Sequence, residues 1–142
     1  MVDAMSGSAR IAGFMNGSID AVFRISGDQP RYIVCDYKTN KLHKDDDPNP
    51  IESYGRASME EAMLRDGYFF QAMIYSVALQ RYLRQRQPGY DFETHFGGVS
   101  YLFLRGLDGS VDANGNQRGN YFWKPPKALI DGLDTLFTEK KQ

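Results

Sequence analysis

The sequence predicts an α/β fold, in which a mixed central sheet is flanked by helices. Residues 17–24 and 31–38 are typical of two strands, and the segment between them is rich in turn-forming residues. A long stretch with apolar residues at helical spacing follows, and after it come a further strand and a short amphipathic helix. The order hairpin, long helix, strand, helix indicates an α/β layer architecture.

Local signals support each of these elements. Ile33, Val34 and Cys35 indicate that the second strand is buried. Ser58 and Glu61 form a capping-box pattern at the start of the long helix, and Pro88 with its neighbours ends it. The remaining expectations are a strand over 95–104, a short last strand over 121–123, a helix over 126–137, and mobile surface loops over 41–54 and 106–120.

Composition limits the class of protein. At 142 residues the chain fits one domain, and no apolar run approaches the roughly 20 residues that span a bilayer. Residues 1–10 do not resemble a signal peptide, so we expect a cytoplasmic protein. The single cysteine, Cys35, excludes an internal disulfide and argues against a zinc module. A net charge of −1 argues against a simple DNA-coating protein, although an enzyme can hold DNA through a local patch.

Three charged residues are the strongest candidates for chemistry. Asp36 and Lys38 are two residues apart in a predicted strand, so their side chains project to the same face. If the hairpin pairs as predicted, Asp20 reaches the same place from the neighbouring strand. Two carboxylates and an ammonium group would then converge at the end of an apolar strand.

Such a cluster is costly unless something binds its charges. Two carboxylates suit Mg²⁺, which would hold and activate a water molecule, while Lys38 orients that water or stabilises an oxyanion. The alternative is structural: Asp36 and Lys38 form an ion pair at the strand end, and Asp20 is a solvated strand residue.

The long helix adds a polar face. Tyr68, Gln71 and Tyr75 are spaced three and four residues apart, which puts them on one side of the helix. Gln71 lies between apolar residues, and could contact a nucleotide phosphate or fix a catalytic side chain. The alternative is an ordinary surface glutamine.

These residues form an ordered set of motifs: Gly17-Ser18-Ile19-Asp20, then Asp36-Tyr37-Lys38-Thr39-Asn40, then Gln71 with Tyr75. The set resembles the PD-(D/E)XK nucleases and, more specifically, the C-terminal nuclease domain of the RecB-type subunit of exodeoxyribonuclease V. The similarity extends to residues 13–16, 79–84 and 95–106. It implies a restriction-endonuclease-like core.

The resemblance implies a role for each matched residue. Asp20 and Asp36 would be metal ligands, with the backbone carbonyl of Tyr37 as a further ligand. Lys38 would be the catalytic lysine, and Gln71 and Tyr75 would complete the site. One departure is that such nucleases also use a histidine or acidic ligand before the hairpin; neither histidine of this chain lies there.

The resemblance also implies a setting. Residues 1–142 would be one nuclease domain, a fragment without the first helix of the fold, and would hydrolyse DNA with Mg²⁺ in double-strand break repair and recombination. Its partners would be single strands and duplex ends of DNA, the helicase region of the same subunit, RecC- and RecD-type subunits and the RecA recombinase, with no membrane. ATP would serve only the absent helicase part. The alternative is a non-catalytic docking module for the recombinase or the sister subunits.

Other polar residues leave alternatives open. His95 is either a general base or a histidine that hydrogen bonds to a neighbouring loop, and His43 is expected to be solvated. Tyr37 and Cys35 are expected in the core. Four basic residues either contact DNA phosphates or form a screened surface: Lys41, Lys44, Arg81 and Arg84.

Overall fold

The computed structural model describes residues 17–138, which form four strands, four α-helices and two short 3₁₀ helices. Residues 1–16, which include the stretch examined for a signal peptide and part of the family resemblance, lie outside the described residues. In chain order the elements are β1 (Ala21–Ile25), β2 (Arg31–Lys38), η1 (Pro50–Tyr54), α1 (Arg56–Arg65), α2 (Tyr68–Arg86), α3 (Phe92–His95), β3 (Phe96–Phe103), η2 (Leu104–Gly106), β4 (Asn120–Trp123) and α4 (Lys127–Thr138). The predicted α/β class is confirmed.

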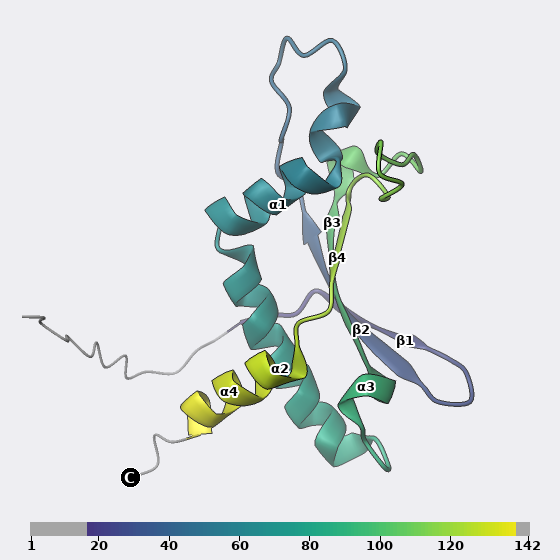
Figure 1. The fold of residues 1–142 in the computed structure, drawn as a ribbon, viewed down its shortest axis with the longest axis vertical. Coiled ribbons are helices and arrows are strands. Elements are labelled where there is room, and N and C mark those ends of the chain that lie inside the picture. The colour runs from purple at the N-terminus through teal and green to yellow at the C-terminus, as the bar shows by residue number, and fades with distance from the viewer. Residues whose placement is uncertain (1–16, 139–142) are drawn as a thin grey trace, which may run out of the picture.

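The strands form one mixed sheet in the order β1-β2-β3-β4 (Figure 1). β1 and β2 are the predicted antiparallel hairpin, with Ala21 opposite Cys35. β2 and β3 run parallel, with Asp36 opposite Tyr101, because the intervening helices return the chain before it re-enters the sheet. β4 pairs antiparallel with β3. β2 is therefore an interior strand, with β1 beside Arg31–Cys35 and β3 alongside it as far as Lys38.

The predicted long helix is in fact two helices. α1 and α2 are separated by Asp66 and Gly67, and Gly67 has a φ of 71°, in the left-handed region that glycine adopts without a Cβ penalty. α1 also begins at Arg56 after Gly55, so Ser58 lies inside the helix and forms no capping box. The sequence did not show the break because a lone glycine within a helical pattern is usually tolerated.

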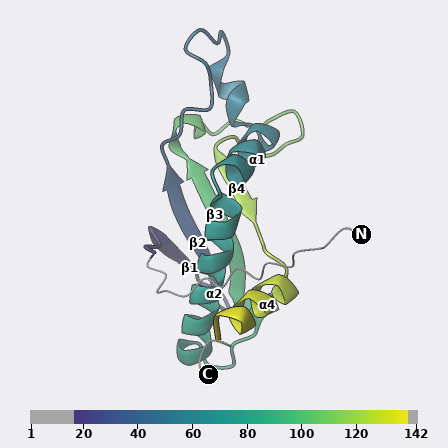
Figure 2. The same ribbon diagram turned by 90° about the vertical axis from the view of Figure 1, so that its left-hand side faces the viewer.

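The helices α1, α2 and α4 lie on one side of the sheet (Figure 1 and Figure 2). The core fills the space between them and the sheet, and it includes Val34, Met59, Met63, Ala72, Leu79, Leu83, Val99, Phe103 and Ile130. The strand residues that alternate with the core positions face the other way, and Phe23, Ile25 and Phe122 are half-exposed there. Within residues 17–138, no helix is both long and apolar enough to cross a membrane.

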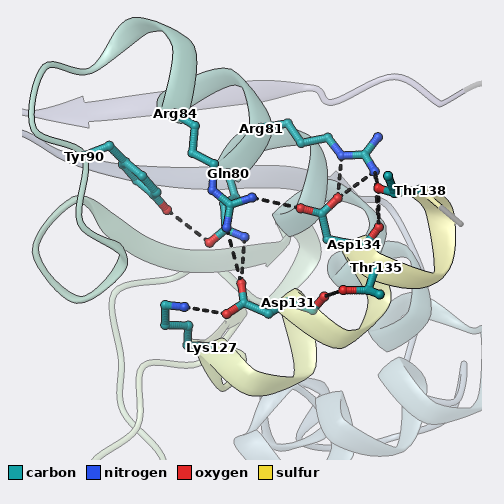
Figure 3. Close-up of polar contacts among 9 residues, drawn as sticks. All are labelled: Gln80, Arg81, Arg84, Tyr90, Lys127, Asp131, Asp134, Thr135 and Thr138. Atoms are coloured by element: carbon teal, nitrogen blue, oxygen red, sulfur yellow. Dashed lines mark hydrogen bonds and ion pairs between the residues drawn. The ribbon is translucent and has the colours of Figure 1, made fainter.

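α4 is held against α2 by a polar cluster (Figure 3). The carboxylate of Asp134 accepts hydrogen bonds from Nε of Arg81 at 2.6 Å and from a terminal nitrogen of Arg84 at 3.0 Å. Gln80 has no exposed surface and donates to Asp131 Oδ1 at 3.1 Å. The predicted C-terminal amphipathic helix is confirmed, with polar contacts supplementing its apolar face.

Both predicted loops contain some local structure. The first includes η1, and the second has a bridge between Val111 and Gln117. Within the second loop, Asp112 accepts backbone hydrogen bonds from Asn114 and Asn116, both at 2.9 Å, and it also binds the N–H of Arg56 at 3.1 Å. The second loop is thereby tied to the start of α1, and its mobility stays a prediction.

The strand predicted over 95–104 begins one residue later, at Phe96, because a short helix precedes it. The side chain of Asp91 accepts a hydrogen bond from the N–H of Thr94 at 2.9 Å and caps this helix, α3. Helix α3 was not predicted, although Asp91 is a helix-start signal in the sequence.

Candidate functional site

The predicted catalytic residues meet where β1 begins and β2 ends. β1 starts directly after Asp20, whereas the sequence predicted Asp20 within the strand. The register that puts Ala21 opposite Cys35 places Asp20 beside Asp36, one position further along the ladder. Asp36 and Lys38 occupy alternate positions of β2, so both project toward the helix side of the sheet.

The two carboxylates have different environments. Asp20 is exposed, and its Oδ2 accepts a hydrogen bond from the backbone N–H of Tyr37 at 3.0 Å. Asp36 is only 4% exposed. Burial raises the pKa of Asp36, the hydrogen bond and charge of Lys38 lower it, and the nearby Asp20 carboxylate raises it again. The net effect is a raised pKa for Asp36. A further cation nearby would therefore stabilise the anionic form of Asp36.

The ammonium group of Lys38 is enclosed by contacts. Nζ lies 2.9 Å from Oδ2 of Asp36 and donates a hydrogen bond to Oε1 of Gln71 at 3.2 Å. It also lies 4.0 Å from the centre of the Tyr68 ring. A largely buried ammonium needs such partners because it has lost much of its water. The ion pair of the structural alternative does exist, but its carboxylate is buried, its ammonium is mostly covered, and α2 adds contacts to it.

One face of α2 brings Gln71 and Tyr75 to the strands, as the spacing predicted. Nε2 of Gln71 donates to the hydroxyl of Tyr75 at 2.9 Å, and that hydroxyl donates to the carbonyl of Ser18 at 2.7 Å. Burial raises the pKa of Tyr75, and the neighbouring carboxylates Asp36 and Asp20 raise it further. The hydroxyl therefore stays protonated and can donate a hydrogen bond. Gln71 is therefore not a surface residue: it links Lys38 to the segment before β1.

Tyr101 is a residue of the site that the sequence analysis did not identify. It is fully buried, and its hydroxyl donates to Oε1 of Gln71 at 3.0 Å. Burial raises the pKa of Tyr101 above its ordinary value, so this group also remains protonated. The sequence offers one weak signal for Tyr101: it is the residue with a hydroxyl among the alternating positions Val99, Tyr101 and Phe103. Because tyrosine is common in strands, that signal does not single it out.

The carboxylate pair matches the requirements of Mg²⁺ better than those of zinc. Within residues 17–138, no three side chains of His, Cys, Asp or Glu converge to hold a metal. Mg²⁺ needs only one or two carboxylates and keeps several waters. Oδ2 of Asp36 is buried and lies 2.9 Å from the Lys38 ammonium. The Asp20 carboxylate lies beside Asp36, so one ammonium offsets only part of two negative charges, and the pair fits a further hard cation.

The basic residues expected at DNA phosphates do not gather at one place. Arg81 and Arg84 lie on the second half of α2 and are engaged by Asp134 of α4 (Figure 3). Both guanidinium groups are half-exposed and help to hold α4 against α2, and their contact with DNA stays a prediction. Lys41 and Lys44 lie in the loop that follows β2, where Lys41 pairs with the aspartate four residues later.

The histidines are structural. Nε2 of His95 lies 3.1 Å from Oε1 of Gln29, and the His95 ring stacks on Tyr90. His95 therefore hydrogen bonds to a neighbouring loop, as its structural alternative predicted. His43 is not merely solvated, because its Nδ1 lies 3.0 Å from the hydroxyl of Tyr54.

The expectation for the core residues around the site was right for Cys35 and wrong for Tyr37. Cys35 is buried, whereas the Tyr37 side chain is 42% exposed. Tyr37 alternates with Asp36 and Lys38 near the end of β2, so it points to the opposite face of the sheet, and its ring contacts solvent.

The chain is similar to proteins named RecBCD enzyme subunit RecB. It is 42% identical over 128 residues to that subunit of Mycolicibacterium smegmatis, a match that covers 89% of this chain and 12% of the relative. It is also 42% identical over 128 residues to the Escherichia coli subunit, covering 90% of this chain and 10% of the relative. For Haemophilus influenzae the identity is 39% over 128 residues, with 90% and 10% covered. The chain spans about a tenth of the length of these relatives. No known protein-family model matches it.

Proposed function

We propose, from the 42% identity between about nine tenths of this chain and RecB subunits, that the chain is the nuclease domain of a RecB-type subunit. In this proposal it hydrolyses phosphodiester bonds in DNA with Mg²⁺ and acts in double-strand break repair and recombination. These relatives are named as subunits of a RecBCD enzyme, and that name, together with the motif resemblance, supports RecC- and RecD-type partner subunits. The same resemblance supports single strands and duplex ends of DNA as substrates, an attached ATP-driven helicase region, and contact with the RecA recombinase.

One observation carries the chemical part of the proposal. Asp20 and Asp36 lie side by side, Asp36 is buried with a raised pKa, and the 2.9 Å contact with the Lys38 ammonium offsets only part of their charge. A purely structural ion pair needs only one carboxylate, whereas Mg²⁺ takes one or two. The arrangement of a hairpin, a parallel strand and α2 is compatible with the PD-(D/E)XK core that the motifs suggest.

In this proposal each residue of the site has a separate role. Asp20 and Asp36, with the backbone carbonyl of Tyr37, would hold the Mg²⁺. When bound, Mg²⁺ neutralises charge on the scissile phosphate and lowers the pKa of a bound water. Lys38 presents its ammonium beside Asp36, where it orients that water or stabilises the developing oxyanion. Gln71 keeps Lys38 in place, because its carbonyl oxygen accepts the Lys38 hydrogen bond.

DNA contacts are assigned to the loop after β2. This loop carries Lys41 and Lys44, and it leaves the sheet at the strand end that holds Lys38. Ammonium groups there can contact the phosphates that flank the bond to be cut.

Cleavage of labelled single-stranded DNA tests the proposal. We would assay the chain alone and within the M. smegmatis RecB subunit, where it replaces the matching segment, with the parent subunit as positive control. We expect Mg²⁺-dependent cleavage by the hybrid, and a loss of at least about a hundredfold in Asp36→Ala. Asp46→Ala, in an exposed loop, is the matched control and should cut normally.

Two results would contradict the proposal. Cleavage by Asp36→Ala at the rate of the unsubstituted hybrid would exclude Asp36 from the chemistry. A hybrid that folds and assembles but does not cut, beside an active parent, would favour the docking role instead.

A further inference from the structure

We propose that Tyr68 and Tyr101 are positioning residues for Lys38: Tyr68 acts through its ring face, and Tyr101 acts through Gln71. The catalytic consequence rests on the proposed function, whereas the positioning itself can be measured without any cleavage. Neither tyrosine is part of the motif set that the sequence analysis assigned to catalysis.

The Lys38 ammonium is enclosed on three sides. Its side chain is 13% exposed, and Nζ contacts Asp36 at 2.9 Å and Oε1 of Gln71 at 3.2 Å. The third side is the Tyr68 ring, with its centre 4.0 Å from Nζ, and the Tyr101 ring centre lies further away at 5.3 Å. The face of an aromatic ring attracts a cation through its quadrupole, and more strongly where water is excluded.

The Tyr68 ring is itself held in place. Its hydroxyl donates to Oδ1 of Asn40 at 3.1 Å, and the Asn40 amide nitrogen donates to Oδ2 of Asp66 at 3.0 Å. Tyr68 is also the first residue of α2, directly after the left-handed Gly67. The break between α1 and α2 thus sets the position of the ring under Lys38.

Tyr101 fixes the orientation of the Gln71 amide. In the parallel ladder Tyr101 is opposite Asp36, so both side chains project to the helix side of the sheet. The Tyr101 hydroxyl donates to Oε1 of Gln71 at 3.0 Å, while Nε2 of Gln71 donates to Tyr75 at 2.9 Å. With both ends of the amide bonded in this way, the carbonyl oxygen faces Lys38.

The two contacts restrict an otherwise flexible side chain. A lysine has a four-carbon stem with many rotamers, and an ammonium placed by one ion pair could swing around the carboxylate. With the ring beneath it and the Gln71 carbonyl beside it, Lys38 is preorganised. Loss of either tyrosine contact should lower the turnover number and leave the affinity for DNA unchanged.

Nuclear magnetic resonance tests the positioning directly. The chain would carry ¹³C-labelled lysine, and the Lys38 Hε signals would be assigned by their absence in Lys38→Met. Protons over an aromatic face resonate upfield, so we expect an upfield Lys38 signal in the wild type and in Tyr68→Phe, but not in Tyr68→Leu. Tyr82→Leu, at an exposed position of the same helix, is the control and should keep the shift. A normal Lys38 shift in the wild type, or an unchanged shift in Tyr68→Leu, would overturn the proposal.

Steady-state cleavage by the RecB hybrid tests the consequence. We expect Tyr68→Leu to lower kcat by about tenfold with KM for DNA unchanged, and Tyr68→Phe to retain most of the activity. Tyr101→Phe keeps the ring but loses the hydroxyl, and it should lower kcat as well. Full activity in both Tyr68→Leu and Tyr101→Phe would overturn the proposal. If the unsubstituted hybrid does not cut, the proposed function fails, and the spectra alone decide the positioning: Tyr101→Phe should then also shift the Lys38 signal, and an unchanged signal would overturn the role of Tyr101.

Discussion

The charge of the Asp36 carboxylate is disfavoured by burial and favoured by Lys38. Asp36 lies near the end of an interior strand, where burial disfavours its charge, and Lys38 offsets only part of that cost. The Asp20 carboxylate, which lies beside it, also disfavours that charge. Such a residue lowers stability in exchange for a function, and the function that we propose for Asp36 is the binding of a cation.

This cost should appear as a pH dependence of stability in Mg²⁺-free solution. The pKa of Asp36 in the folded protein is raised above its ordinary value of 3.8, so above pH 3.8 the folded state binds more protons than the unfolded state. The stabilisation from protonated Asp36 is complete below that value and is lost as the pH rises through the raised pKa. Urea unfolding at a series of pH values should show the wild type losing stability relative to Asp36→Asn across this window. Parallel curves for the two proteins would contradict the prediction.

The residues of the site were predictable to different degrees. Asp36 and Lys38 follow from the two-residue period of a strand, and Gln71 with Tyr75 follows from the period of a helix. Tyr101 could not be predicted in this way, because its position in the site depends on which residue of β3 lies opposite Asp36. A parallel register between strands joined by a long crossover leaves no local pattern in the sequence.

At the scale of elements, hydrophobic pattern predicted the strands and helices but not the division between α1 and α2. Leu64 and Phe70 continue the apolar sequence on either side of the break, and both are exposed. Gly67 takes a left-handed conformation because Tyr68 must turn back toward Asn40 and the sheet. Tertiary contacts rather than local propensity decide this position.

The contact between α2 and α4 makes a prediction about stability. Asp134→Ala removes the acceptor shared by Arg81 and Arg84, both partly exposed, and should lower the free energy of unfolding by about 1–2 kcal/mol. Asp46→Ala, at an exposed loop position, should change it by less than about 0.5 kcal/mol. Urea denaturation measures both. Because this cluster lies at the other end of α2 from Gln71, the folded Asp134→Ala protein should keep its Lys38 spectrum, and a changed spectrum would show that the two regions are coupled.

At the scale of the whole molecule, the fold gathers the candidate functional groups at one end of the sheet. The helices cover one face of the sheet, and the site lies on that face, where β2 ends and α2 begins (Figure 2). The hairpin supplies the carboxylates, while α2 and β3 supply the groups that hold Lys38. Charge alone would not have located the site, since the net charge of the chain is only −1.

Mg²⁺ binding by this chain tests most directly the claim that the two carboxylates form a cation site. Thermal unfolding would be followed during titration with Mg²⁺ for the wild type, Asp20→Asn, Asp36→Asn and the control Asp46→Asn. At a concentration a hundred times Kd, binding stabilises a fold by about 2.7 kcal/mol, or roughly 5–10 °C in Tm for a domain of this size. We predict that rise for the wild type and Asp46→Asn and its loss in Asp20→Asn and Asp36→Asn. A wild-type Tm that does not change with Mg²⁺, or an equal rise in Tm in all four proteins, would contradict the account.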